Sequence, residues 1–328
     1  MTSTARPAGV PAGTGEPVAV LGAYHLLERI GAGGLGEIYR ARDVVHGRTV
    51  AVRRIPAALA SDPARSAAFE KACQAAAAIS HPNVAMLYKW ERTDGELLVA
   101  HEFAAGQTVA QLGGGALNAR RAVEIALEVA LGLEALHAAG LVHGDLRPGN
   151  VVVTPKGHVK LLDAGLAAFT GSGALRASAA GRIGTLPPTS RHVLAYMSPE
   201  EALGERCGAQ SDLFSLGAIL YELLTGRSAF ERVTADETLL AVVQTSPDGM
   251  DTIPQPLASI VRRALAKPLD RRYRTAAQMA GELRAMQEML DAEAPPLEPA
   301  GGSGAPRWLW WVAAMAAGGL GVAGWLTL

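Results

Sequence analysis

The chain has 328 residues with 30 basic and 31 acidic side chains, so it is long enough for one large or two medium domains. A charge so close to balance excludes a protein that binds nucleic acid mainly by electrostatic attraction. Only two cysteines occur, Cys73 and Cys207, neither in a metal-ligand spacing, and both are expected to be small buried hydrophobes in a reducing compartment.

The first segment, residues 1–20, is rich in Thr, Ala, Gly and Pro and lacks the apolar stretch of a secretory signal, so we expect a disordered tail. Beyond it, short apolar segments bounded by turn residues predict five strands, over 24–30, 37–41, 49–55, 86–92 and 96–103. A helix is predicted between the third and fourth of these strands, at 63–79, where Pro63 suits a first helical turn.

From Asn118 onward the pattern is helical. Asn118 can cap a helix that runs to about Ala139 and ends at Gly140. Four more helices are expected, near 211–225, 235–244, 257–266 and 276–292. Strands first and helices later predict an α+β body with two unlike lobes, 21–104 and 105–292.

The last segment, Trp308–Leu328, has no charge over 21 residues, which is about 31 Å of helix and matches a bilayer core. Tryptophans lie near both of its ends, and Arg307 lies just before it. We expect a single-pass tail anchor after a Pro/Gly-rich linker, 293–307, with the body of the chain in the cytoplasm. A buried soluble helix is the alternative, but such helices usually carry polar residues on one face. Two small-xxx-small pairs in the segment, Ala314 with Gly318 and Ala317 with Gly321, could pack two such helices into a homodimer, although an Ala/Gly-rich segment also contains this spacing by chance.

Between the first two predicted strands lies the run Gly31-Ala32-Gly33-Gly34-Leu35-Gly36, a G-x-G-x-x-G pattern. Glycines allow backbone N–H groups to approach phosphate oxygens without a Cβ in the way. The same pattern before a helix indicates a dinucleotide-binding turn, and a plain glycine-rich hairpin is another alternative. Because the run lies between two strands, a lid over nucleotide phosphates is favoured.

A second run, His143-Gly144-Asp145-Leu146-Arg147-Pro148-Gly149-Asn150, places a carboxylate and a carboxamide five residues apart in a turn-prone segment. Another carboxylate follows in Asp163-Ala164-Gly165. Ordinary turn chemistry explains Asp or Asn at any one of these positions, whereas the three together indicate a site.

These motifs resemble those of the bacterial, eukaryotic-like (Hanks-type) Ser/Thr protein kinases, and the resemblance covers about residues 24–292. It rests also on Val50-Ala51-Val52, His81-Pro82-Asn83-Val84, Tyr196-Met197-Ser198-Pro199-Glu200, Ser211-Asp212-Leu213-Phe214-Ser215-Leu216-Gly217 and Arg272-Tyr273. The resemblance implies a β-rich small lobe and a helical large lobe, with ATP and Mg²⁺ in the cleft between them and a protein Ser or Thr as acceptor.

The resemblance also implies roles for single residues. Asp145 would accept the hydroxyl proton of the substrate, and Asn150 and Asp163 would hold magnesium. Arg147 and Arg53 would lie near the transferring phosphates. The residues around the nucleotide would be Gly31, Gly33, Gly34, Gly36, Ile38, Ala51, Arg53, Glu102, Ala104 and Val152.

Further roles concern the frame of this site. Backbone groups of Glu102 and Ala104 would bind adenine, and His101 would be the gatekeeper. The resemblance implies two anchors of the large lobe: a buried ion pair between Glu200 and Arg272, and Asp212 holding the catalytic loop.

Two departures from the family affect the phosphate contacts. Arg53 stands where active relatives have Lys, and its planar fork places its donors differently from an ammonium group. The helix that should supply a partner Glu has Ala72 at that position, and Glu70 points about 200° round the helix from it. The Lys–Glu pair is therefore absent on both sides.

Five departures concern the activation segment and the catalytic loop. Gly144 replaces an arginine that grips a phosphorylated segment, and Arg147 stands at the position of a Lys. Ala164 replaces a Phe, which predicts a gap beside the helix bearing Ala72. Val193 replaces a Thr, and the segment is lengthened around 186–192. Its candidate phosphorylation sites are Thr170, Ser172, Ser178, Thr185, Thr189 and Ser190.

Three functions are compatible with this pattern. The first is a membrane-tethered, pseudokinase-like signalling protein that binds ATP with magnesium and acts through protein partners, because a ground-state nucleotide tolerates displaced contacts better than a transition state does. The second is an active kinase in which Arg53 replaces the lysine. The third is an adaptor whose cleft binds no nucleotide.

Overall fold

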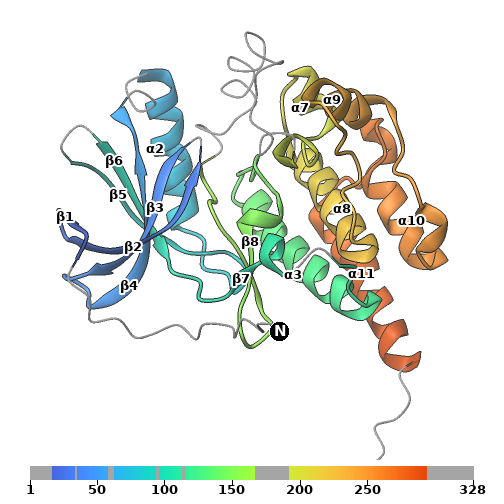
Figure 1. The fold of residues 1–328 in the computed structure, drawn as a ribbon, viewed down its shortest axis with the longest axis horizontal. Helices are drawn as coiled ribbons and strands as arrows, with labels where there is room; N and C mark the ends of the chain where they lie inside the picture. The colour runs from blue at the N-terminus through green and yellow to red at the C-terminus, as the bar shows by residue number, and fades with distance from the viewer. Residues whose placement is uncertain are drawn as a thin grey trace, which may run out of the picture. The chain divides into compact units, whose positions relative to one another are not determined.

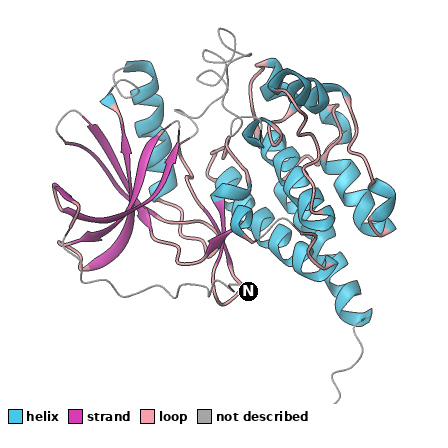
Figure 2. Cartoon of the chain, in the orientation of Figure 1, coloured by secondary structure: helices cyan, strands magenta, loops and turns pink. Residues whose placement is uncertain are grey.

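The computed structural model describes residues 17–33, 35–57, 63–93, 96–112, 115–166 and 192–293. Residues 1–289 form one compact unit and residues 290–328 a second one. In the first unit a β-rich lobe is followed by a helical lobe, so the expected α+β, two-lobed body is confirmed (Figures 1 and 2).

The small lobe is an antiparallel sheet of six strands in the order β1-β2-β3-β4-β6-β5. Its strands are β1 (Ala19–Leu21), β2 (Tyr24–Gly33), β3 (Gly36–Asp43), β4 (Arg48–Ile55), β5 (Leu87–Thr93) and β6 (Glu96–Glu102). The five predicted strands are all present. The structure adds β1, which pairs with β2, so the tail predicted for residues 1–20 ends before Ala19.

Helix α2 (Pro63–Ala77) covers one face of this sheet (Figure 1). Alternate residues of each strand point to opposite faces, and both faces are lined by apolar side chains. Phe69 and Cys73 of α2 are fully buried against Ile55 and Val99 of the sheet. Cys73 is thus the small buried hydrophobe that we expected, whereas Cys207 is half-buried.

The large lobe contains five long helices: α3 (Ala119–Ala138), α8 (Ala209–Thr225), α9 (Ala235–Gln244), α10 (Gln255–Ala264) and α11 (Ala276–Glu293). All five were predicted, and Asn118 caps α3 by accepting a hydrogen bond from the backbone N of Arg121 at 2.8 Å. Helix α8 packs closely on α10, because a Cβ on Gly217 would lie 2.6 Å from the Cβ of Ala264.

Short elements complete the large lobe, and the sequence did not predict them. A three-stranded sheet contains β7 (Gln107–Thr108), β8 (Val151–Val153) and β9 (Val159–Leu161). The short helices are η1 (Val109–Gln111), η2 (Pro148–Asn150), α7 (Pro199–Leu203), η4 (Met250–Thr252) and η5 (Leu269–Arg271).

Some of the sequence predictions fall outside the described residues: Gly34, the six candidate phosphorylation sites, most of the linker 293–307 and the span Trp308–Leu328. Within the part of the chain that the structure describes, no helix has both the length and the apolar character needed to span a bilayer.

Candidate active site

The glycine run forms the turn of the β2–β3 hairpin. Gly33 pairs with Gly36 across it, and Gly31 pairs with Ile38. Gly36 has φ of 98°, and a Cβ there would lie 1.9 Å from the carbonyl oxygen of Arg54, so glycine is required at this position. The expected hairpin context is confirmed.

One face of the sheet carries the side chains that the sequence placed around a nucleotide. Residues directly opposite each other on neighbouring antiparallel strands share a face, as do residues two apart on one strand. Ile38 of β3 lies opposite Arg53 of β4, and Ala51 of β4 lies opposite His101 of β6. These four residues therefore share one face, with Arg53 and His101 both buried.

Arg53 crosses from this face to the other lobe, where its Nη2 donates to Oδ2 of Asp163. Both side chains are largely buried, with exposed fractions of 7% for Arg53 and 13% for Asp163. Burial by itself would raise the pKa of Asp163, but the charge and the hydrogen bond of Arg53, together with the nearby His101 and His143, hold that pKa below its usual value. The ionised carboxylate is thus already paired with this chain's own cation.

The backbone around Asp163 is unusual. Asp163 has φ of 61°, a left-handed conformation that a residue other than glycine adopts at a cost, and such strain concentrates at functional sites. Gly165, two residues later, has φ of 86°, and a Cβ there would lie 3.0 Å from the Cβ of Ala76 and 3.4 Å from the carbonyl oxygen of Ala72. The turn therefore rests directly on helix α2.

This contact corrects one expectation. We predicted a gap where Ala164 replaces an aromatic residue, but Ala164 is 2% exposed because the turn and α2 approach each other closely. Glu70 is exposed on α2, while Ala72 is half-buried, so the absence of a carboxylate facing Arg53 from this helix position is confirmed.

Asp212 of α8 fixes the start of the catalytic loop, residues 143–150, by hydrogen bonds to its backbone. Its carboxylate accepts the backbone N–H groups of His143 and Gly144, each at 2.9 Å, and lies 2.8 Å from Nε2 of His137. Gly144 has φ of 67°, which glycine adopts without strain. The predicted anchoring role of Asp212 is confirmed, and His137 is a partner that the sequence did not reveal.

Asp145 faces its own loop. Nε of Arg147 donates to both of its carboxylate oxygens, at 3.1 and 3.2 Å, and Nδ2 of Asn150 donates to Oδ2 at 3.0 Å and to the backbone oxygen at 2.8 Å. Burial raises the pKa of Asp145 more than the charge of Arg147 lowers it. A carboxylate with a raised pKa is a stronger base, which suits acceptance of a hydroxyl proton.

Asn150 and Asp163 come together through the β8–β9 hairpin. The N–H of Leu162, next to Asp163, donates to the carbonyl oxygen of Asn150 at 2.9 Å. Since Asn150 uses its Nδ2 within the loop, its side-chain oxygen remains for a ligand. One carboxylate and one amide oxygen fit Mg²⁺ that also binds phosphates, and the described residues contain no cluster of three or more ligating side chains that would form an all-protein cage.

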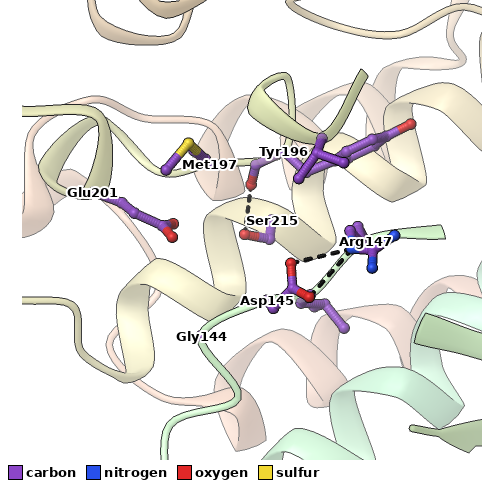
Figure 3. Close-up of a pocket in the computed structure, with 9 residues that line it drawn as sticks. Gly144, Asp145, Arg147, Tyr196, Met197, Glu201 and Ser215 are labelled. Atoms are coloured by element: carbon purple, nitrogen blue, oxygen red, sulfur yellow. Dashed lines mark hydrogen bonds and ion pairs between the residues drawn. The ribbon is translucent and has the colours of Figure 1, made fainter. Parts of the chain in front are cut away.

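Arg147 lies over Gly149, where a Cβ would be 2.9 Å from its Nη1. Beside it is a small pocket below the segment that follows residue 191 (Figure 3). Val193 and Tyr196 line this pocket, and the backbone oxygen of Tyr196 accepts a hydrogen bond from Oγ of Ser215 at 2.7 Å. Val193 has no hydroxyl to offer Asp145 or Arg147.

Glu201 lines the same pocket and was missed by the sequence reasoning (Figure 3). It is 8% exposed, and its Oε2 accepts the N–H of Ser198 at 3.4 Å as part of the cap of α7. Burial raises its pKa to about 8, and the charges of Asp145 and Asp212 act in the same direction. The S-P-E-E string could have indicated a helix cap, but not a buried acid.

The predicted ion pair of the large lobe is confirmed. Nη1 of Arg272 lies 2.7 Å from Oε1 of Glu200 and Nη2 lies 3.2 Å from Oε2, while Oγ of Ser211 donates to Oε1 at 2.7 Å. Burial alone would raise the pKa of Glu200, yet these bonds keep it below its usual value.

Glu102 is the last residue of β6. Its side chain lies 2.8 Å from Nζ of Lys160 on β9 and so connects the sheets of the two lobes. Ala104 follows in the connecting segment, and Val152 of β8 is buried near Gly106, where a Cβ would be 2.9 Å from its Cγ1. Adenine contacts by these residues stay a prediction.

Comparisons with known proteins agree with this geometry. The protein kinase domain family matches residues 24–282. A probable serine/threonine-protein kinase of Streptomyces coelicolor, SCO3848, is 35% identical over 317 residues, which cover 93% of this chain and 44% of that protein. Serine/threonine-protein kinase PknB of Mycolicibacterium smegmatis is 35% identical, covering 83% of this chain and again 44% of the relative.

The chain thus spans 44% of the length of these two curated relatives. Among solved structures, the Mycobacterium tuberculosis PknI kinase domain is similar with a TM-score of 0.62 at 22% identity, covering 81% of this chain and 97% of that one. At this level of identity the likeness concerns the fold.

Proposed function

The chain belongs to the bacterial Hanks-type Ser/Thr protein kinase family, and from this premise we propose that it is a membrane-anchored signalling protein that binds ATP with magnesium but transfers phosphate to protein Ser or Thr only weakly. The observation that carries the proposal is the ion pair between Arg53 and Asp163, with no carboxylate facing Arg53 from α2.

The pairing affects the nucleotide and the transition state differently. A kinase needs a cation on the phosphates and a free carboxylate on the metal. Here the two groups are paired with each other, so part of the charge of each is already neutralised before nucleotide and magnesium arrive. Arg53 then has no acidic partner on α2 to fix its position. Phosphoryl transfer depends on accurate positioning of the phosphates. Displaced contacts therefore reduce the stabilisation of the transition state more than they weaken binding of the nucleotide.

The remaining groups support nucleotide binding. The glycine hairpin leaves room for phosphates, and Asn150 and Asp163 supply the oxygens for magnesium, which would neutralise phosphate charge when bound. Asn150 and Arg147 each donate a hydrogen bond to the carboxylate of Asp145, which supports a role for Asp145 as a base. The parts of the site that bind are thus retained, while the part that positions the phosphates is altered.

Two measurements on the full chain test this proposal. ATP should raise the melting temperature in the presence of MgCl₂ and raise it less without the metal. Radiolabelled ATP with a generic protein acceptor should give little incorporation. Robust incorporation that disappears in Asp145→Asn would contradict the weak-transfer proposal.

An active kinase is the second candidate, favoured by the position of Arg53 itself, whose charge reaches the metal-ligand carboxylate. It predicts measurable turnover that Arg53→Ala abolishes and Arg53→Lys retains. A third candidate, an adaptor, predicts no magnesium-dependent thermal shift with ATP, and such a shift would exclude it.

The membrane part of the proposal rests on the uncharged segment Trp308–Leu328. The chain should sediment with membranes, and a chain that ends at residue 306 should stay in the supernatant. Replacing Gly318 and Gly321 by Leu tests association through the small residues, since larger side chains prevent close helix approach. In detergent, the parent chain and the Leu variant would differ in apparent mass on size-exclusion chromatography only if the segment forms a homodimer.

A further inference from the structure

His101 contains a buried ring nitrogen without a hydrogen-bond partner. The residue is 5% exposed, and its Nε2 makes no hydrogen bond to any part of the chain that the structure describes. An unpaired buried polar atom destabilises the protein, because it has lost its hydrogen bonds to water without gaining others. A ligand that supplies the missing partner would recover that loss.

The neighbours of His101 are residues that the family resemblance places around a nucleotide. Its side chain shares a sheet face with Ala51 and Arg53, and it immediately precedes Glu102, where β6 ends. Nε of Arg53 is a second buried donor with no partner among the described residues. Two buried polar groups on one sheet face thus lack a partner among the described residues, which a bound molecule could supply.

We propose that His101 is a specificity-determining residue whose Nε2 accepts a hydrogen bond from the exocyclic amino group at position 6 of adenine. The inference rests on the proposed function, which brings ATP into the cleft with its base beside Glu102. The proposed hydrogen bond is a side-chain contact to the base. It is made to the 6-amino group, the substituent that distinguishes adenine from other purines.

The protonation state of the ring supports an acceptor. Burial lowers the pKa of His101 to about 4, although the charge of Asp163 opposes this shift, and the charge of Arg53 makes a smaller contribution in the same direction as burial. The imidazole is therefore neutral at physiological pH, and one of its nitrogens has a free lone pair.

The test uses calorimetric titration of the full chain with Mg·ATP and with the triphosphate of purine riboside, which has hydrogen in place of the 6-amino group. His101→Leu removes the acceptor, whereas His101→Gln retains a side-chain oxygen. Loss of the amino group should weaken binding about fivefold more in the unmodified chain than in His101→Leu, as expected for one hydrogen bond. The Gln variant should fall between them.

A measurement without substitution accompanies it. The ¹⁵N resonance of His101 Nε2 should move on addition of Mg·ATP and stay near its free position with the analogue. An equal loss of affinity in the unmodified chain and in His101→Leu, or an Nε2 resonance that is the same with both ligands, would overturn the inference alone. Failure of ATP to bind the unmodified chain would overturn the proposed function together with it.

Discussion

The large lobe and the small lobe differ in how closely they follow the kinase pattern. In the large lobe the expected polar anchors are in place: Asp212 holds two loop amides, and Glu200 pairs with Arg272. In the small lobe Arg53 has no acid facing it from α2 and pairs with Asp163 instead.

The two sets of contacts do different work. The large-lobe anchors satisfy buried charges and backbone groups, so losing one leaves an uncompensated buried partner and destabilises the fold. A Lys–Glu pair that positions phosphates contributes mainly to the transition state and can change without unfolding the protein. The fold therefore retains the first set whether or not phosphoryl transfer is retained.

The largest effect is expected for the buried pair of the large lobe. Arg272→Ala should lower the free energy of unfolding by about 3–5 kcal/mol, because it leaves Glu200 buried without its cation. The Arg272 side chain is fully buried and also donates to the backbone oxygens of Ala266, Gln210 and Lys267. Urea unfolding measures this loss, and a loss below about 1 kcal/mol would contradict the distinction between the lobes.

The next effect depends on pH and concerns Glu201. Its pKa is raised to about 8, so the folded protein keeps a proton that the unfolded chain releases near the ordinary carboxyl pKa. Its stabilising contribution is complete at low pH and is lost as pH rises to 8, by up to about 1.4 kcal/mol per pH unit. Glutamine does not titrate, so the free energy of unfolding of Glu201→Gln should rise steadily relative to that of the parent chain as pH increases from 5 to 8. A constant difference would show that Glu201 is charged in the folded state.

A smaller effect is expected at the turn between the lobes. Gly165→Ala should cost about 2 kcal/mol, because it combines a left-handed φ, which costs about 1–2 kcal/mol, with a close contact to Ala76. Gly140→Ala is the matched control, since Gly140 has φ of 73° and no atom within 4 Å of an added Cβ. Thermal melts of both variants separate backbone strain from packing on α2. Equal losses would show that the contact with α2 contributes nothing.

The smallest effect is expected for an ion pair of the small lobe with similar geometry. Arg54 and Glu96 form two bonds of 2.9 Å, but their side chains are 29% and 31% exposed. Arg54→Ala should therefore cost at most about 1 kcal/mol. The same urea titration on Arg272→Ala compares this partly exposed Arg–Glu pair with a buried one. A loss of stability as large as that of Arg272→Ala would contradict the expectation that a partly exposed ion pair contributes less than a buried one.

The sequence predicted those parts of the fold that have strong local signals. Helix α3 begins after its cap, Asn118, and α9 covers the predicted residues 235–244. The strands β7, β8 and β9 were missed because two or three residues show no periodicity, and their pairing is set by distant neighbours.

The candidate site was predictable to the extent that roles follow motifs. Asp145, Asn150 and Asp163 do come together, and Asp212 does hold the loop. The bond between Arg53 and Asp163 joins residues 110 positions apart, and local spacing carries no information about it. The raised pKa of Glu201 likewise depends on burial by elements that are remote in sequence.

The contact between Gly165 and helix α2 also bears on how such a chain could change over generations. Because a Cβ at Gly165 would lie 3.0 Å from Ala76, the helix and the turn have no spare room for larger residues. Changing Arg53 back to lysine in one step would not recreate its missing acid, and a glutamate at position 72 would have to be accommodated beside this tight contact. A Lys–Glu pair in this chain would therefore need substitutions on both the strand and the helix, at Arg53 and at Ala72.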